Sequence, residues 1–119
     1  MAKIVVIDDS KMMRLILRRV LEKAGHEVEE WESISAMEVP DKIAASAPDL
    51  IITDFSMPGC NGGTVAKMVH KTSPELPVLV LTATHDPAVI EVLRKQEVAQ
   101  ILYKPLNESE LLDTLSLLL

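Results

Sequence analysis

Five polar side chains, scattered along the sequence, have types that could do chemistry together. They comprise three carboxylates, a hydroxyl and an ammonium group: Asp8, Asp9, Asp54, Thr82 and Lys104. Carboxylates held close together repel one another, which raises a pKa unless a cation offsets the repulsion. Lys104 and a hard divalent ion could both do so, and Mg²⁺ prefers carboxylate, water and phosphate oxygens. A carboxylate in such surroundings can act as a nucleophile towards phosphorus.

Short apolar runs precede these side chains along the chain. Runs of β-branched and apolar residues that end in turn residues predict buried strands. Four such runs lead to the polar groups: Lys3–Ile7 before Asp8, Leu50–Asp54, residues 77–82, and Gln100–Tyr103 before Lys104. A fifth run, residues 26–31, is rich in carboxylates, which is typical of a strand at the edge of a sheet.

Helical patterns separate the predicted strands. Residues 11–24 repeat apolar side chains at core-facing helical spacing, after a cap at Asp9 or Ser10 and before a stop at Gly25. That core-facing stripe comprises Met13, Ile16, Leu17, Val20, Leu21 and Ala24. Further helices are predicted from Asn61 or Thr64, from Pro87 and after Asn107.

The predicted helix between residues 36 and 47 contains Pro40, which lacks a backbone donor. Either this helix is kinked, or it begins with Pro40 in its first turn, and the second alternative is favoured.

A strand followed by a helix, five times over, predicts an α/β fold with a doubly wound parallel sheet and helices on both faces. Parallel strands bring their carboxyl ends to one edge, where ligands bind in such folds. We therefore expect the five polar groups to converge. Alone, Asp9 could merely cap a helix and Lys104 could be a solvated surface lysine. Polar groups at four strand ends are harder to explain as separate caps and surface residues.

Length and charge limit the classes of function. At 119 residues we expect one domain, residues 1–119, without an output domain. A net charge of −6 argues against a nucleic-acid partner, which needs a basic surface. No apolar segment approaches the roughly 18 residues of a membrane span, and the first residues lack the layout of a signal peptide. The single Cys60 cannot form an internal disulfide, so a cytoplasmic location is expected.

The motifs at the strand ends resemble those of response-regulator receiver domains, which two-component histidine kinases phosphorylate. The matching segments are Asp8-Asp9, residues 54–62 (Asp-Phe-Ser-Met-Pro-Gly-Cys-Asn-Gly), Thr82-Ala83 and Lys104-Pro105. They occur in the family's order over nearly the whole chain. The resemblance implies a flavodoxin-like five-stranded sheet with strand order 2-1-3-4-5.

The resemblance also implies a role for each acidic residue. Asp54 would be the phosphoacceptor. Asp9, Asp54 and the backbone carbonyl of Ser56 would bind Mg²⁺ directly, and Asp8 would do so through a water molecule. The chain would then be a signalling domain that catalyses only its own phosphorylation and dephosphorylation.

The remaining implied roles concern the response and its partners. Lys104 would pair with the phosphoryl group, and the Lys104–Pro105 bond would be cis. Thr82 would move towards the phosphoryl group and switch the surface of the fourth helix, fifth strand and fifth helix. The implied partners are a histidine kinase or histidine phosphotransfer protein and an unidentified output protein, with the chain a monomer or weak dimer.

The sequence departs from the family pattern near the fifth strand. Ile101 stands where the family often has an aromatic switch residue. Tyr103 should share its face of the strand, so it either substitutes in part, or the aromatic switch is absent and Tyr103 is an ordinary strand-end residue. Val98 replaces a frequent glycine, so we expect a less regular end to the preceding helix.

Two further expectations concern small groups of side chains. Ser56 and Thr84 occupy positions that tune hydrolysis in the family, and neither carries a carboxylate or amide to position water. We therefore predict an aspartyl phosphate that is not especially short-lived. Met12 and Leu15 lie off the apolar stripe of the first helix; either they form an exposed docking patch, or the helix is rolled and buries one of them.

Two alternative functions remain open at this point. A receiver-like docking module that is never phosphorylated would have the same fold, although it would not need the acidic set. A phosphatase of the haloacid-dehalogenase type would also use an aspartyl intermediate, but it carries Asp-x-Asp, whereas Asp8 and Asp9 are adjacent. A dinucleotide-binding fold is disfavoured because no Gly-x-Gly-x-x-Gly follows the first strand.

Overall fold

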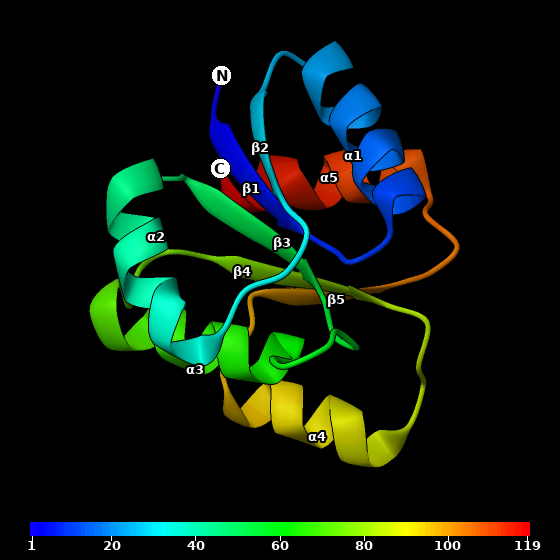
Figure 1. The fold of residues 1–119 in the computed structure, drawn as a ribbon. Helices are drawn as coiled ribbons and strands as arrows, with labels where there is room; N and C mark the ends of the chain where they lie inside the picture. Colours follow the sequence, from blue (N-terminus) through cyan, green and yellow to red (C-terminus); the bar gives the residue numbers. More distant parts are fainter.

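The computed structural model describes residues 1–119, which form a five-stranded parallel sheet in the order β2-β1-β3-β4-β5 (Figure 1). The strands are β1 (Lys3–Ile7), β2 (Glu27–Trp31), β3 (Leu50–Asp54), β4 (Val78–Thr82) and β5 (Gln100–Tyr103). This is the flavodoxin-like order that the resemblance implied. The carboxylate-rich strand β2 lies at an edge of the sheet, as its charge predicted.

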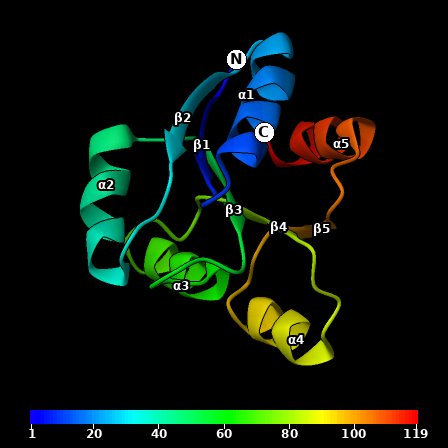
Figure 2. The same ribbon diagram turned by 45° about the vertical axis from the view of Figure 1, so that its right-hand side comes forward.

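Helices cover both faces of the sheet (Figure 2). One face carries α1 (Lys11–Lys23) and α5 (Glu108–Leu118), and the other carries α2 (Val39–Ser46), α3 (Gly62–Thr72) and α4 (Pro87–Lys95). The alternation of side chains along a strand feeds two separate cores. In β1, Ile4 and Val6 join the core under α1 and α5, whereas Val5 and Ile7 join the core on the other face.

Polar side chains cap the helices where the sequence predicted them. Ser10 Oγ accepts a hydrogen bond from the backbone of Met13 at 3.2 Å, and Asn61 Oδ1 accepts one from Thr64 at 2.9 Å. These bonds satisfy backbone donors that the first helical turn leaves free. Helix α2 has Pro40 in its first turn, after a short 3₁₀ helix at Ala36–Glu38, so the favoured alternative for this segment is confirmed.

The core-facing stripe predicted for α1 is wrong at two positions. Leu17 and Leu21 are buried as expected, but Ile16 and Ala24 are exposed. Ile16 lines an apolar hollow beside Lys104 and Leu106 instead of entering the core, and Ala24 lies just past the last helical residue, Lys23. The spacing of apolar residues predicts a helix correctly, but it does not fix the roll of that helix against the sheet.

The ends of α1 and α4 differ in how their left-handed residue is supplied. Gly25 has a positive φ of 93° and ends α1, as predicted. After helix α4, Val98 stands in place of the frequent glycine, and the residue with left-handed backbone angles is Glu97, at φ 57°. This conformation is strained for any residue other than glycine. None of the helices is both long enough and apolar enough to cross a membrane.

Candidate functional site

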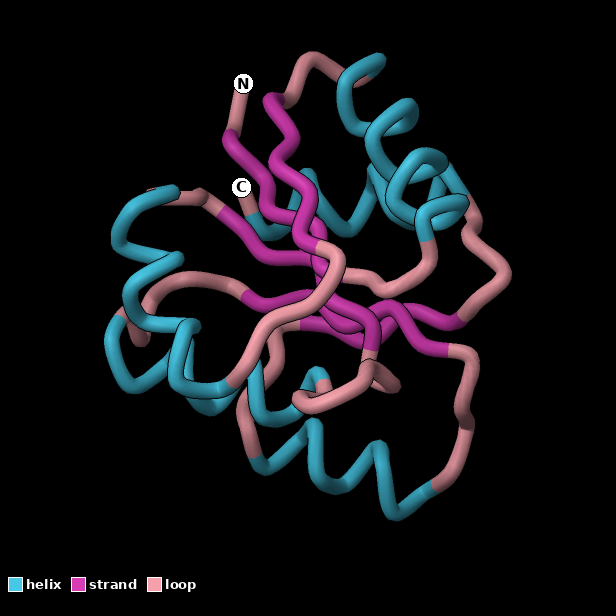
Figure 3. Tube along the Cα trace, viewed as in Figure 1, coloured by secondary structure: helices cyan, strands magenta, loops and turns pink.

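Three carboxylates meet at the carboxyl edge of the sheet, where the loops that follow the strands gather (Figure 3). Asp8 and Asp9 follow β1, and Asp54 is the last residue of β3, the strand paired with β1. One oxygen from each carboxylate lies within 4.8 Å of the other two. Asp8 and Asp54 are 2% and 8% exposed, while Asp9 is exposed to solvent. The predicted convergence of these three residues is confirmed.

Lys104 brings a positive charge into this cluster. Its Nζ atom lies 3.3 Å from Asp8 Oδ2 and 3.5 Å from Asp54 Oδ2, so it bridges two carboxylates. Strand β4 separates β5 from β3, and the long lysine side chain spans that distance. The Lys104–Pro105 peptide bond is cis, as the resemblance implied. Asp8 Oδ1 also accepts a hydrogen bond from the backbone of Ser10 at 2.9 Å.

The pKa of Asp54 lies above its ordinary value, chiefly because burial disfavours the charged carboxylate. Lys104 lowers this pKa and the nearby Asp8 raises it again, and the net direction is upward. The Lys104 ammonium therefore does not offset the combined effect of burial and of Asp8 on the pKa of Asp54. A divalent cation would supply the missing charge, and a set of carboxylate oxygens at the edge of solvent is the donor set that suits Mg²⁺.

Thr82 and Ser56 are less closely joined to the cluster. Thr82 is the last residue of β4 and is buried, and its Oγ1 accepts a hydrogen bond from the backbone of Thr84 at 3.2 Å. It makes no hydrogen bond to the acidic side chains. Ser56 is exposed in the loop that follows β3. The structure thus brings four of the predicted residues into direct contact range and leaves these two at the margin.

Gly62 allows α3 to begin directly against the end of β3. A Cβ atom at this position would lie 2.7 Å from the backbone oxygen of Asp54 and 3.1 Å from Phe55 Cα. Both contacts are with backbone atoms that cannot move aside easily. The Gly62 N–H also donates a hydrogen bond to Phe55 O at 2.9 Å. The glycine of the motif is therefore required by the close approach of the chain to Asp54.

Three contacts near the site were not predicted from the sequence. Arg14 Nη1 donates a hydrogen bond to Asp8 O at 2.7 Å, and Arg14 Nε donates one to Glu30 at 3.2 Å. The rings of His85 and Tyr103 stack, with centroids 4.2 Å apart and planes 12° from parallel. One signal could have indicated Arg14: a side chain in the first turn of a helix points back towards the residues before that helix.

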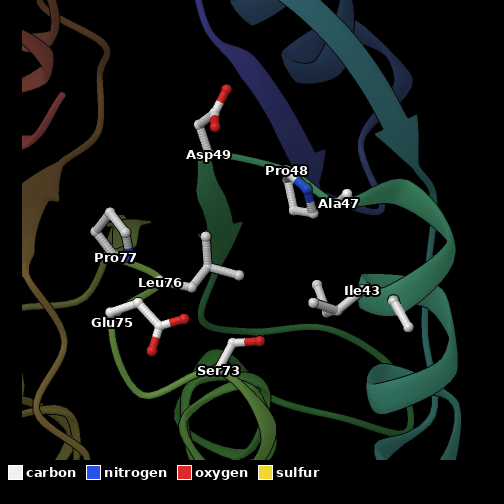
Figure 4. A pocket seen from close by; sticks show the side chains of 9 residues that line it. Ile43, Ala47, Pro48, Asp49, Ser73, Glu75, Leu76 and Pro77 are labelled. Atoms are coloured by element: carbon white, nitrogen blue, oxygen red, sulfur yellow. The ribbon is translucent and has the colours of Figure 1, made fainter.

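A hollow of about 380 Å³ lies at the opposite edge of the sheet, between α2 and the loop that precedes β4 (Figure 4). Its charged side chains are Asp49 and Glu75. The carboxylate of Asp49 already accepts a hydrogen bond from the backbone of Lys3 at 2.8 Å. The hollow therefore lacks the grouped charges that distinguish the carboxyl edge, and ligand sites of open α/β sheets lie at that edge.

The fold and the site together define a flavodoxin-like domain with an acidic, lysine-bearing cluster at the carboxyl edge of its sheet. The family profile "Response regulator receiver domain" matches residues 4–116. The chain belongs to this family, whose members are signalling domains.

Relatives with known names agree with this assignment. The chain is 27% identical over 114 residues to the chemotaxis protein CheY of Thermotoga maritima, covering 96% of this chain and 94% of that protein. It is 35% identical to the sensory/regulatory protein RpfC of Xanthomonas campestris, of which the match spans only 16%. Among solved structures, CheY4 of Vibrio cholerae superposes with a TM-score of 0.88 at 31% identity, covering 100% of this chain and 99% of that one.

Proposed function

We propose that the chain is a phosphoacceptor of a two-component or phosphorelay system, in which Asp54 accepts a phosphoryl group from a phosphohistidine. One observation carries the proposal: Lys104 bridges Asp8 and Asp54 within a cluster of three carboxylates. A structural ion pair would need one carboxylate for one lysine. The remaining carboxylate oxygens are ligands that a divalent cation would use, and the Lys104 ammonium is a group that would pair with a phosphoryl group.

In the proposed reaction an oxygen of the Asp54 carboxylate attacks phosphorus. A new P–O bond forms, the P–N bond of the phosphohistidine breaks, and the imidazole leaves with the bonding pair and takes up a proton. The nucleophile must be ionised, and Lys104 favours that form by lowering the pKa of Asp54. After transfer, the Lys104 ammonium, 3.5 Å from Asp54 Oδ2, is close enough to pair with the phosphoryl oxygens.

Asp9 and Asp54, with the backbone carbonyl of Ser56, would hold Mg²⁺ directly, and Asp8 would hold it through water. The grouping of the three carboxylates supports this set, because Mg²⁺ uses few protein carboxylates and keeps water and phosphate ligands. When bound, the ion would neutralise charge on the transferring phosphoryl group. Thr82 would contribute its hydroxyl after leaving its present partner, the backbone of Thr84.

The phosphoryl group would enter from a histidine kinase or histidine phosphotransfer protein that docks beside α1. Met12 and Leu15 are 68% and 43% exposed, so the alternative that a roll of α1 buries one of them is wrong. The same helix also borders an apolar hollow of about 420 Å³, which is lined by Met13, Ile16, Val20, Pro105 and Leu106, with Lys104 and Glu108 as its charged residues. An apolar surface beside the acceptor suits a partner helix.

Phosphorylation would switch the surface of α4, β5 and α5 for an unidentified output protein. The β4–α4 loop is tied to Thr82 through Thr84, so a movement of Thr82 would change that loop. Thr84 Oγ1 accepts a hydrogen bond from Asp86 at 3.1 Å within the same loop. The aspartyl phosphate would not be especially short-lived, because neither Ser56 nor Thr84 carries a carboxylate or an amide that would position attacking water.

The test is incubation of the protein with acetyl phosphate, with and without Mg²⁺, followed by intact-protein mass spectrometry. The wild type should gain one phosphoryl group only when Mg²⁺ is present. Asp54→Asn should gain none, because its side chain has no carboxylate nucleophile. Beryllofluoride with Mg²⁺ should likewise shift amide signals in the NMR spectrum of the wild type and not in that of Asp54→Asn.

Four outcomes would contradict the proposal or a part of it. No Mg²⁺-dependent change in the wild type would favour a docking module that is never phosphorylated. Equal labelling of wild type and Asp54→Asn would show that a residue other than Asp54 accepts the phosphoryl group. Loss of the label within seconds would contradict the expected lifetime, and rapid release with steady turnover would favour the aspartyl phosphatase alternative.

A further inference from the structure

Every polar atom of Asp8 has a partner in the structure. Its backbone N–H donates to Trp31 O at 3.2 Å, which extends the ladder between β1 and β2 by one residue. Its carboxylate accepts from the backbone of Ser10 and from Lys104. Its backbone carbonyl accepts from Arg14 Nη1 at 2.7 Å. The contact with Arg14 is the one that sequence reasoning missed and that the proposed chemistry does not use.

Arg14 is itself held from the other side. Its Nε atom donates to Glu30 Oε1 at 3.2 Å, and Arg18 Nε, one turn further along α1, donates to Glu30 Oε2 at 2.5 Å. Hydrogen bonds and charges from Arg18, and then from Arg14, hold the pKa of Glu30 below its ordinary value, so its carboxylate remains an anchor. The Arg14 side chain is only 12% exposed, so its guanidinium group occupies a defined position.

We infer that Arg14 is a positioning residue for the cation site: by holding the carbonyl of Asp8 it fixes the peptide plane from which Asp9 projects. The inference rests on the proposed function, since it needs Mg²⁺ to bind the acidic cluster. A peptide group is planar, so fixing the oxygen of the Asp8–Asp9 peptide also fixes the nitrogen and Cα of Asp9. Asp9 is exposed and has no side-chain hydrogen bond of its own, so its backbone is what directs its carboxylate.

The chain offers a matched control in Arg18. Both arginines lie on α1 and bond the same carboxylate of Glu30, but Arg18 also bonds Glu22 and does not contact Asp8. A role limited to attaching α1 to β2 would make the two residues equivalent. Coulomb attraction alone predicts tighter Mg²⁺ binding when either positive charge is removed. A positioning role predicts the opposite sign, and only for Arg14.

The experiment is calorimetric titration of Mg²⁺ into the wild type, Arg14→Gln and Arg18→Gln, with thermal unfolding of each protein in parallel. Groups that orient a metal ligand typically cost 10–100-fold in affinity when changed, so Arg14→Gln should raise the Mg²⁺ dissociation constant about tenfold and Arg18→Gln less than about twofold. Both variants should lower Tm to a similar extent, because each loses one bond to Glu30.

Arg14→Lys protects the test against a variant that fails to fold. Its ammonium can bond Glu30 and keep α1 attached, but it lacks the planar fork that reaches two acceptors at once, so its Mg²⁺ affinity should lie between those of wild type and Arg14→Gln. The inference about Arg14, but not the proposed function, would be overturned if Arg14→Gln bound Mg²⁺ as tightly as the wild type, or if both glutamine variants weakened Mg²⁺ binding equally. A wild type that binds no Mg²⁺ would overturn the proposed function as well.

Discussion

Asp54 experiences opposing influences at the end of β3. Burial and the neighbouring Asp8 raise its pKa, while Lys104 lowers it, and the upward shift prevails. The folded protein therefore binds a proton at Asp54 more readily than the unfolded chain does. A residue arranged for stability would show the reverse, since ion pairing usually lowers the pKa of a structural carboxylate. The site is thus poised for a further cation at some cost in stability.

This shift makes a prediction about stability and pH. Because the folded-state pKa of Asp54 is raised, its ionised form opposes folding at neutral pH, and the opposition vanishes below about pH 4, the ordinary range for Asp. Asp54→Asn should therefore increase the free energy of unfolding at pH 7, because it removes a buried negative charge that opposes folding. Urea denaturation should show that the difference in unfolding free energy between Asp54→Asn and the wild type becomes smaller as the pH falls from the folded-state pKa of Asp54 towards its unfolded-state pKa.

A control for general charge effects is Asp113→Asn, which removes the same charge from an exposed position on α5. It should change stability much less at pH 7. Addition of Mg²⁺ should stabilise the wild type and not Asp54→Asn, because a ligand stabilises the folded state that binds it. An advantage of Asp54→Asn that persisted undiminished at low pH would contradict this account of the shift.

At the scale of elements, the junction between β3 and α3 sets the position of Asp54. Gly62→Ala would place a Cβ atom 2.7 Å from Asp54 O, so the start of α3 must move away from the strand end. Overpacking of this kind costs about 2 kcal/mol, and we expect that loss in urea denaturation together with slower labelling by acetyl phosphate.

Gly63→Ala is the matched control for this substitution. Its Cβ atom would lie 3.1 Å from two side-chain atoms and no backbone atom: Val92 Cγ1, and Asn61 Oδ1, which needs to shift by only a few tenths of an ångström while it caps Thr64. Alanine also favours the helix over glycine by about 1 kcal/mol, so this variant should remain close to wild type in stability and labelling. Equal losses of stability and labelling in Gly62→Ala and Gly63→Ala would show that the close approach of Gly62 to Asp54 O is not the cause of those losses.

The β4–α4 loop and the end of β5 are joined by the stack of His85 on Tyr103. The same loop is tied to Thr82, which pairs in register with Tyr103 across the sheet. If Tyr103 takes part in the response in place of an aromatic residue at Ile101, Tyr103→Leu should remove the beryllofluoride-dependent amide shifts of α4 in NMR spectra. Labelling of Asp54 should continue, because the carboxylates and Lys104 are untouched. Unchanged shifts in α4 would make Tyr103 an ordinary strand-end residue.

At the scale of the whole molecule, the exposed apolar face of α1 lies beside an acidic site. Leu15→Asp should slow phosphotransfer from the cognate kinase at least severalfold, because a charge in an apolar contact must lose water without gaining a partner. Labelling by acetyl phosphate should be unchanged. Leu117→Asp makes the same charge change on α5, at a side chain that is 87% exposed, and it should affect neither reaction. Equal loss of both reactions in Leu15→Asp would mean damage to the site itself.

Local patterns in the sequence were enough to predict the helices and strands and the edge of the sheet at which the site lies. Alternation of apolar strands with amphipathic helices predicted the parallel sheet, and parallel strands carry their carboxyl ends to one edge. Asp8, Asp9, Asp54 and Lys104 follow from that rule, because each stands at a strand end. Caps at Ser10 and Asn61 were also predictable, since capping depends on residues a few positions apart.

The contacts between elements distant in the sequence could not be predicted in this way. Periodicity fixes the faces of α1 but not its roll, so the exposure of Ile16 could not be predicted from spacing. The bridge that Lys104 makes to two carboxylates, the bond from Arg14 to the Asp8 carbonyl and the stack of His85 on Tyr103 depend on side-chain reach between packed elements. The physical reason is that propensity and periodicity are local properties, whereas these contacts are set by the packing of both cores.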